Sequence, residues 1–142
     1  MAMADGMTIS FESRILPDHA RLECTGTFSL ETMLGIYEQA FALAAGAGRD
    51  AVLIDARNVT GREPTLGERY TQAVHVAELQ STQSPRIRLA ILGHEPMIHR
   101  ERFGEIVATE RGAVVRVFTD ESAALEWLLT PSRSPQSMSK RR

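Results

Sequence analysis

The sequence contains a single cysteine, Cys24, in 142 residues. One cysteine can form neither an internal disulfide nor a cysteine-based zinc site, so a reducing compartment suits the chain best. The sequence also has no excess of basic residues: it contains 16 Lys and Arg and 18 Asp and Glu, which gives a formal net charge of −2. A surface without a basic field does not favour nucleic acid as a partner.

Long apolar runs and glycine-rich site motifs are missing as well. No segment approaches the ~20 apolar residues of a membrane span, and the opening MAMADGMT has neither the cationic start nor the apolar core of a secretory signal. No G-x-G-x-x-G, P-loop or G-x-S-x-G motif occurs, which disfavours nucleotide enzymes and α/β-hydrolases. We therefore expect a cytoplasmic protein without a cofactor.

What is present is the composition of one folded domain. Hydrophobic residues make up 43% and charged residues 24%, close to the average of globular proteins. We expect residues 7–129 to form the domain, with a disordered N-terminus at 1–6 and a disordered basic tail at 130–142, which reads TPSRSPQSMSKRR.

Hydrophobic periodicity predicts the order β-β-α-β-α-β-α-β-α. Alternation at 8–16 and 20–27 predicts an antiparallel hairpin, and later strands are expected at 51–55, 86–92 and 113–118. Because each of these three strands is reached through a helix, they should be parallel. The expected fold class is α/β: a single mixed sheet with an N-terminal hairpin and helices alternating with strands.

Three of the four expected helices have recognisable starts. Ser29 can cap the first, which ends near Gly46 and Gly48. Thr65 and Glu68 fit a capping box for the second, with Leu66 and Tyr70 on its inward stripe. The third is expected from about 97 to 111, with Phe103, Ile106 and Val107 inward, and Thr119 or Asp120 should cap the last.

Four segments resemble the STAS superfamily, the fold of bacterial anti-sigma-factor antagonists such as SpoIIAA: VLIDARNVTG at 52–61, PTLGERY at 64–70, RLAIL at 88–92 and VRVFTDESAALEWL at 115–128. The pattern looks most like the bacterial SpoIIAA-like (STAS/SEC14-type) branch. The resemblance implies a non-enzymatic regulatory domain that binds a protein partner or a small ligand. It also implies a phosphorylated serine in an Asp-Ser-Ser-Gly-like turn.

The sequence departs from that turn. Arg62, Glu63, Pro64 and Thr65 stand where the antagonists have Asp-Ser-Ser-Gly, so the acceptor serine is absent. Thr65 has two interpretations: a phosphate acceptor at a helix N-terminus, or an ordinary N-cap.

Polar residues follow two expected strands at their carboxyl ends, where open α/β sheets bind ligands. The candidate ligand-binding or partner-binding residues at this edge are Asp55, Arg57, Asn58, Thr60, Thr65, His94 and Glu95. We predict no catalytic residue and no metal site, because His94 and His99 are five apart with Pro96 between them, whereas a zincin motif needs a spacing of four. A small hydrolase or metal enzyme built on His94, Glu95 and Asp55 is an alternative.

The SEC14 side of the resemblance implies a carrier that holds an apolar or lipid-like molecule between the sheet and its helices. The residues that could line such a pocket are Tyr37, Phe41, Tyr70 and Phe103. The same apolar stripes also serve any helix that packs on a core. A hairpin strand at the sheet edge offers a route to a homodimer.

Overall fold

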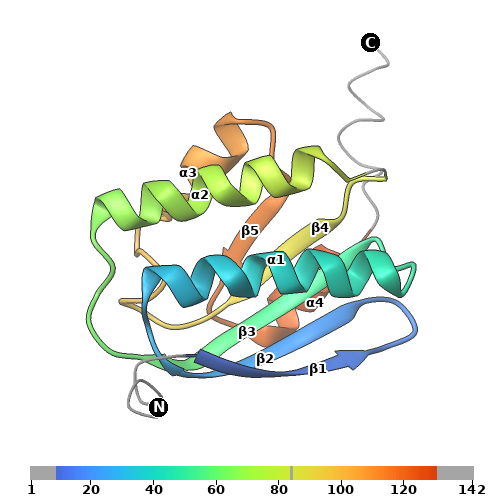
Figure 1. Ribbon diagram of the computed structural model, residues 1–142, viewed down its shortest axis with the longest axis horizontal. Coiled ribbons are helices and arrows are strands. Elements are labelled where there is room, and N and C mark those ends of the chain that lie inside the picture. The colour runs from blue at the N-terminus through green and yellow to red at the C-terminus, as the bar shows by residue number, and fades with distance from the viewer. Residues whose placement is uncertain (1–8, 84, 131–142) are drawn as a thin grey trace.

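The computed structural model describes residues 9–83 and 85–130 (Figure 1). Its sheet has five strands in the order β1-β2-β3-β4-β5. β1 (Ile9–Ile15) is antiparallel to β2 (Ala20–Thr27), and β3 (Ala51–Thr60), β4 (Arg88–Leu92) and β5 (Val115–Phe118) run parallel to β2. The predicted element order and mixed sheet are confirmed. The segment predicted at 1–6 and the tail beyond Thr130 lie outside the described residues.

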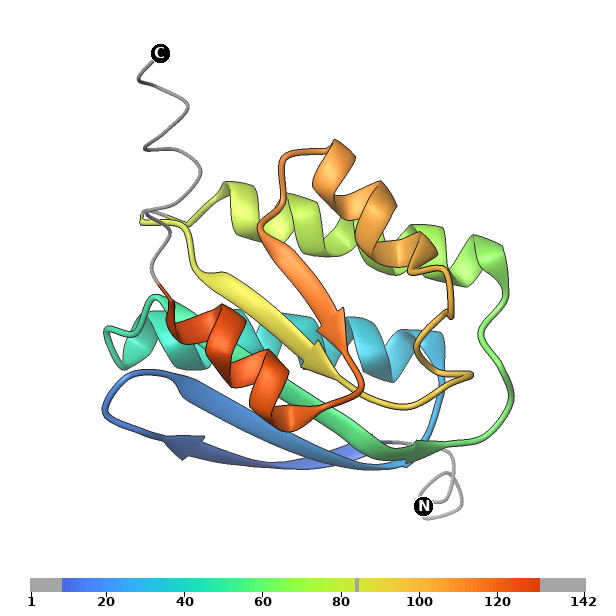
Figure 2. The ribbon, with the colours of Figure 1, turned by 180° about the vertical axis from the view of Figure 1, so that it is seen from behind.

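The helices cover the two faces of the sheet unequally. α1 (Leu30–Gly46) and α2 (Leu66–Ser81) lie across one face, and α4 (Glu121–Leu129) lies on the other (Figures 1 and 2). α3 (Phe103–Glu110) packs beside α2, next to the edge strand β5. Among the described helices, none has the length and apolar character needed to cross a membrane.

β3 divides the core between these two faces. Val52 and Ile54 are fully buried in the larger cluster under α1 and α2, whereas Leu53 is fully buried in a smaller cluster with Ala124 and Leu128 of α4. Full burial of each such side chain contributes about 1.5–3 kcal/mol. β3 is therefore the interior strand that its apolar run predicts.

The helix caps form as the sequence predicts. Ser29 Oγ accepts a hydrogen bond from Thr32 N at 3.2 Å, and Asp120 Oδ2 accepts one from Ala123 N at 2.8 Å. At α2, Thr65 Oγ1 accepts from Glu68 N at 3.0 Å, while Glu68 Oε1 accepts from Thr65 N at 3.0 Å. These side chains satisfy backbone donors that have no partner within the helix.

β4 and β5 begin slightly later than predicted, and two other predicted boundaries are wrong by several residues. β3 does not end at Asp55 but continues to Thr60, paired with β2, with an irregularity in the register after the Glu23–Asp55 pair. Its charged residues do not end the strand because they pair with each other on the α4 face, while Ala56 and Val59 stay buried on the opposite face. α3 begins at Phe103 and not near Met97, because Arg102 adopts a left-handed conformation (φ 58°), which a right-handed helix cannot continue through.

Candidate functional site

The predicted edge residues lie in three separate places. Asp55 and Arg57 lie inside β3 on the α4 face, and Asn58 and Thr60 are exposed near its end. Thr65 caps α2. His94 and Glu95 are exposed in the connection that follows β4. In the sheet register Asp55 pairs with Leu92, the last residue of β4, so it lies level with the carboxyl end of that strand. The side chains of Asp55 and Arg57, however, belong to a charged cluster on the α4 face of the sheet.

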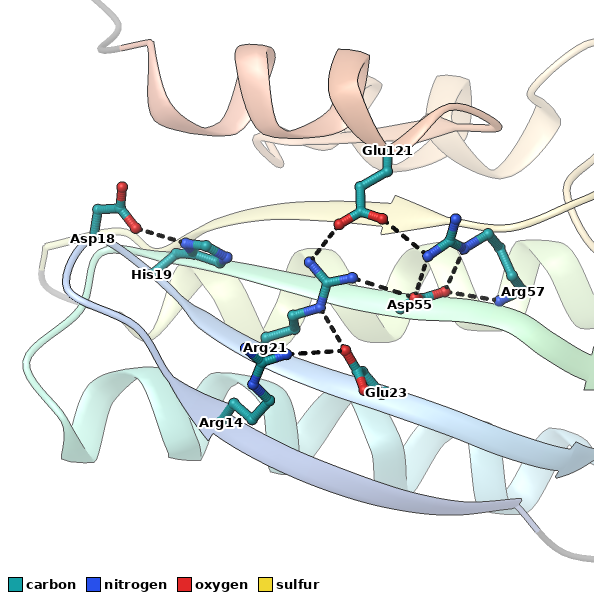
Figure 3. Close-up of polar contacts among 8 residues, drawn as sticks. All are labelled: Arg14, Asp18, His19, Arg21, Glu23, Asp55, Arg57 and Glu121. Carbon is teal, nitrogen blue, oxygen red and sulfur yellow. Dashed lines mark hydrogen bonds and ion pairs between the residues drawn. The ribbon is translucent and has the colours of Figure 1, made fainter.

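This cluster, the Arg21 network, joins β1, β2, β3 and α4 (Figure 3). The Arg21 side chain is 8% exposed, and its guanidinium contacts Glu23 at 3.0 Å, Asp55 at 3.3 Å and Glu121 at 3.0 Å. Arg57 Nη2 contacts Asp55 at 2.8 Å and Glu121 at 3.1 Å. The members of the network are Arg14, Arg21, Glu23, Asp55, Arg57 and Glu121.

The network keeps Asp55 ionised. Burial on its own raises the pKa of this carboxyl, but hydrogen bonds from Arg57 and the charges of Arg57 and Arg21 outweigh burial and hold the pKa below its ordinary value. A carboxylate that accepts from two guanidinium groups is poorly placed to exchange protons with a substrate. Glu121 links the start of α4 to β2 and β3, because it pairs with both Arg21 and Arg57.

The positions of Asp55, His94 and Glu95 do not favour the alternative of a hydrolase or metal enzyme. The oxygens of Asp55 accept from Arg21 and Arg57, and His94 and Glu95 have exposed side chains. Across 9–83 and 85–130, no group of three or more His, Cys, Asp and Glu is placed to hold a metal ion. Burial raises the pKa of the Cys24 thiol to about 12, so this cysteine is protonated and unreactive in the folded protein.

A cavity of about 100 Å³ lies between the sheet and the helices α1, α2 and α3. Apolar side chains from all these elements line it, including Met33, Val76, Ile91, Met97 and Val115. Of the four residues predicted to line a pocket, only Tyr37 does so. Phe41 is packed in the core, and Phe103 is half-buried and does not line the cavity. Tyr70 is exposed, and the Arg111 guanidinium lies over its ring.

The face of α2 explains the misplaced pocket residues. Its buried positions are Arg69, Ala73, Val76, Ala77 and Gln80, so Ala73 and Ala77 of the predicted stripe face inward, whereas Leu66 and Tyr70 do not. The polar side chains of Arg69 and Gln80 point inward because they bond to backbone carbonyls, at Pro96 and Met97 for Arg69 and at Ile87 and Val114 for Gln80. Because these two inward residues are polar, hydrophobic periodicity in the sequence does not identify the buried face of α2.

Three large apolar side chains are left exposed on α2 and α3. Leu66 is 56% exposed, Tyr70 45% and Ile106 48%, although all three were expected to face inward. Leu66 and Tyr70 are one helical turn apart, so they share a face of α2, and Ile106 belongs to the helix that packs against α2. We call Leu66, Tyr70 and Ile106 the α2–α3 surface.

No family model matches the sequence, and no curated protein matches it. Among solved structures, the chain is similar to an anti-sigma factor antagonist from Mycobacterium paratuberculosis, with a TM-score of 0.57 and 11% identity over 85% of this chain and 94% of that one. A protein with a SpoIIAA-like fold from Shewanella loihica gives a TM-score of 0.47 and 20% identity (85% and 94% covered), and phosphorylated SpoIIAA of Bacillus gives 0.46 and 9% (83% and 98%). The strand order, the helix placement and the first of these likenesses together show that this chain has the α/β fold of that anti-sigma factor antagonist.

Proposed function

We propose that this chain is a non-enzymatic regulatory domain that binds a protein partner through the α2–α3 surface and the adjoining connection at 61–65. The observation that carries the proposal is the exposure of Leu66, Tyr70 and Ile106 on two helices that pack together. Tyrosine is among the residues enriched at the hot spots of protein interfaces, and exposed apolar patches mark interaction sites. The fold likeness to an anti-sigma factor antagonist supports a regulatory role for such an interface.

We propose further that this domain works without a phosphoacceptor at the start of α2. The Thr65 hydroxyl already accepts the Glu68 N–H, and the Glu68 carboxylate lies in the same cap, 2.7 Å from Arg62. A phosphate on Thr65 would disrupt this cap and meet the negative charge of Glu68. These contacts support the N-cap interpretation of Thr65.

The partner proposal is tested with a double variant, Leu66→Glu and Tyr70→Glu. Both side chains are exposed, so the variant should fold, and circular dichroism checks this. Proteins retained by the immobilised wild-type chain are identified by mass spectrometry, and the identified partner is then titrated against each purified variant. We expect at least tenfold weaker binding, because charged groups replace two interface anchors.

Leu129→Glu is the matched control, because Leu129 is an exposed apolar residue on α4, at the other face of the sheet. It should leave the affinity for the partner unchanged. Equal affinity of the wild type and the double variant would refute the assignment of this surface.

The second candidate function is a carrier of an apolar small molecule, and the cavity under α1 and α2 supports it. A volume of about 100 Å³ favours a compact occupant over an acyl chain, since an apolar cavity of about 150 Å³ holds a molecule the size of benzene. Native mass spectrometry of the purified chain tests this function. Release of a small molecule on denaturation supports a carrier, and its absence at full sensitivity opposes one.

A further inference from the structure

Arg69 places a buried positive charge in the wall of the cavity. The residue is 6% exposed, and its terminal nitrogens donate to the carbonyls of Met97 at 2.9 Å and Pro96 at 2.7 Å. Glu63 is the one carboxylate paired with Arg69 among the described residues, at 3.5 Å, and its side chain is 62% exposed. A desolvated guanidinium with such weak compensation attracts an anion.

The titration of Arg69 agrees with this geometry. Burial lowers the pKa of the guanidinium, and the nearby Glu63 only partly opposes that effect. Water and the surrounding protein therefore stabilise the Arg69 cation less well than bulk water does. A second anion beside Arg69 would restore the missing stabilisation.

The other polar groups in the cavity wall leave donors in excess. Arg102 lines the cavity as an exposed residue, and within the described ranges no carboxylate pairs with its guanidinium. Gln72 Oε1 accepts from the Tyr37 hydroxyl at 2.7 Å, which leaves the Gln72 amide hydrogens as donors. The lining carboxylate of Glu105 is directed to β5, where its Oε1 accepts from Val117 N at 2.9 Å.

We propose that this cavity binds a small monocarboxylic acid with a compact apolar body, whose carboxylate pairs with Arg69 and Arg102 while its body contacts Val76, Ile91 and Val115. A planar guanidinium suits a carboxylate because two N–H groups can donate to its two oxygens. The volume of about 100 Å³ is smaller than the cavity of about 150 Å³ that holds benzene, so it limits the buried part to a portion of a ring or a short branched chain. This inference rests on the carrier function proposed second above and does not depend on partner binding.

Benzoate and benzamide test the inference, because they share a ring and differ in charge. Dissociation constants are measured by NMR titration of the ¹⁵N-labelled full chain, with the amides of Ala73, Gly104 and Ala108 as reporters in the cavity wall. We expect benzoate to bind roughly tenfold more tightly than benzamide, the difference between a charge-assisted and a neutral hydrogen-bonded pair.

Two variants make the test specific. Glu63→Gln removes an exposed carboxylate that competes for Arg69, so it should keep the fold and strengthen benzoate binding by roughly threefold without affecting benzamide. Ala73→Leu fills the cavity from α2 and should abolish binding of both molecules, provided that circular dichroism shows a folded protein.

The outcomes separate the acid preference from the carrier function. Equal affinity for benzoate and benzamide leaves a carrier but overturns the acid preference, and so does an unchanged benzoate affinity in Glu63→Gln. Absence of saturable shifts with either molecule up to its solubility limit overturns both proposals. Shifts confined to residues outside the cavity wall also overturn both.

Discussion

Replacing Asp55 by Asn removes one negative charge from the Arg21 network while keeping the size and shape of the side chain. The Asp55 carboxylate accepts from Arg57 N at 3.1 Å, Arg57 Nε at 3.0 Å, Arg57 Nη2 at 2.8 Å and Arg21 Nη2 at 3.3 Å. An Asn side chain replaces one of these oxygens by an NH₂ group, which faces guanidinium donors and cannot accept from them.

The expected cost is moderate because both arginines keep other partners. Glu121 still contacts Arg21 and Arg57, and Glu23 still contacts Arg21. The Asp55 side chain is 12% exposed, so the loss exceeds that of a surface pair, and we expect Asp55→Asn to lower the free energy of unfolding by about 2–3 kcal/mol at pH 7. In urea denaturation followed by circular dichroism, this corresponds to a midpoint lower by roughly 1–2 M.

The pH dependence gives an independent check. Because the folded pKa of Asp55 lies below its unfolded value of about 3.9, its contribution to stability is fully present above that value and is lost as pH falls through the folded pKa. The difference between wild type and Asp55→Asn should therefore be constant from pH 7 to about pH 5 and shrink below it.

Glu38→Gln serves as the control for this experiment. Glu38 pairs with His75 at 3.0 Å but is largely exposed, so its removal should cost about 0.5 kcal/mol or less. Equal urea midpoints for the wild type and Asp55→Asn at pH 7 would refute the account of the network. A difference that persists undiminished in strong acid would refute the assignment to the Asp55 charge.

The remaining predictions concern single side chains. Gln80→Leu should destabilise the chain by about 3 kcal/mol in urea denaturation, because it removes the Gln80 bonds to Ile87 O, Val114 O and Val114 N. Val114 O keeps its bond from Leu89 N, whereas Ile87 O and Val114 N lose the Gln80 partner. A change below that of Glu38→Gln would contradict this role. Thr65→Ala should cost about 1 kcal/mol by removing the N-cap, and Thr65→Ser should recover most of it. Cys24, with its pKa raised to about 12, should react with a thiol reagent at pH 8 only after unfolding, and rapid labelling of the folded chain would show that its burial is misjudged.

Much of the fold follows from local pattern. The run at Val52–Ile54 predicts a strand buried on both faces, and Ser29, Thr65 and Asp120 predict helix starts that the hydrogen bonds confirm. Each of these features depends on residues close together in the sequence, where periodicity and capping rules apply directly.

The side-chain positions in the candidate site depend on contacts between residues far apart in the sequence, which local sequence patterns do not reveal. Arg69 faces inward because backbone carbonyls 27 and 28 residues away accept hydrogen bonds from it, and Gln80 faces inward because it also bonds to distant backbone groups. With these two residues on the buried face of α2, Leu66 and Tyr70 face outward. Arg21 is buried because β3 and α4 bring it Asp55 and Glu121. The charges of Arg21 and Glu23, which alternate with apolar residues on the strand at 20–27, are the one sequence signal for this cluster. The pattern does not identify the partners of Arg21, because Asp55 and Glu121 lie on other elements.

Glu105 takes part in two structures at once, since its side chain lines the cavity and holds the backbone N–H of Val117 on the edge strand β5. That amide is protected by a side chain of α3, so it exchanges with solvent whenever Glu105 turns away. Its deuterium exchange rate therefore reports motion of α3 relative to the sheet. An occupant that pulls Glu105 inward would speed this exchange, and one that packs α3 more firmly against the sheet would slow it.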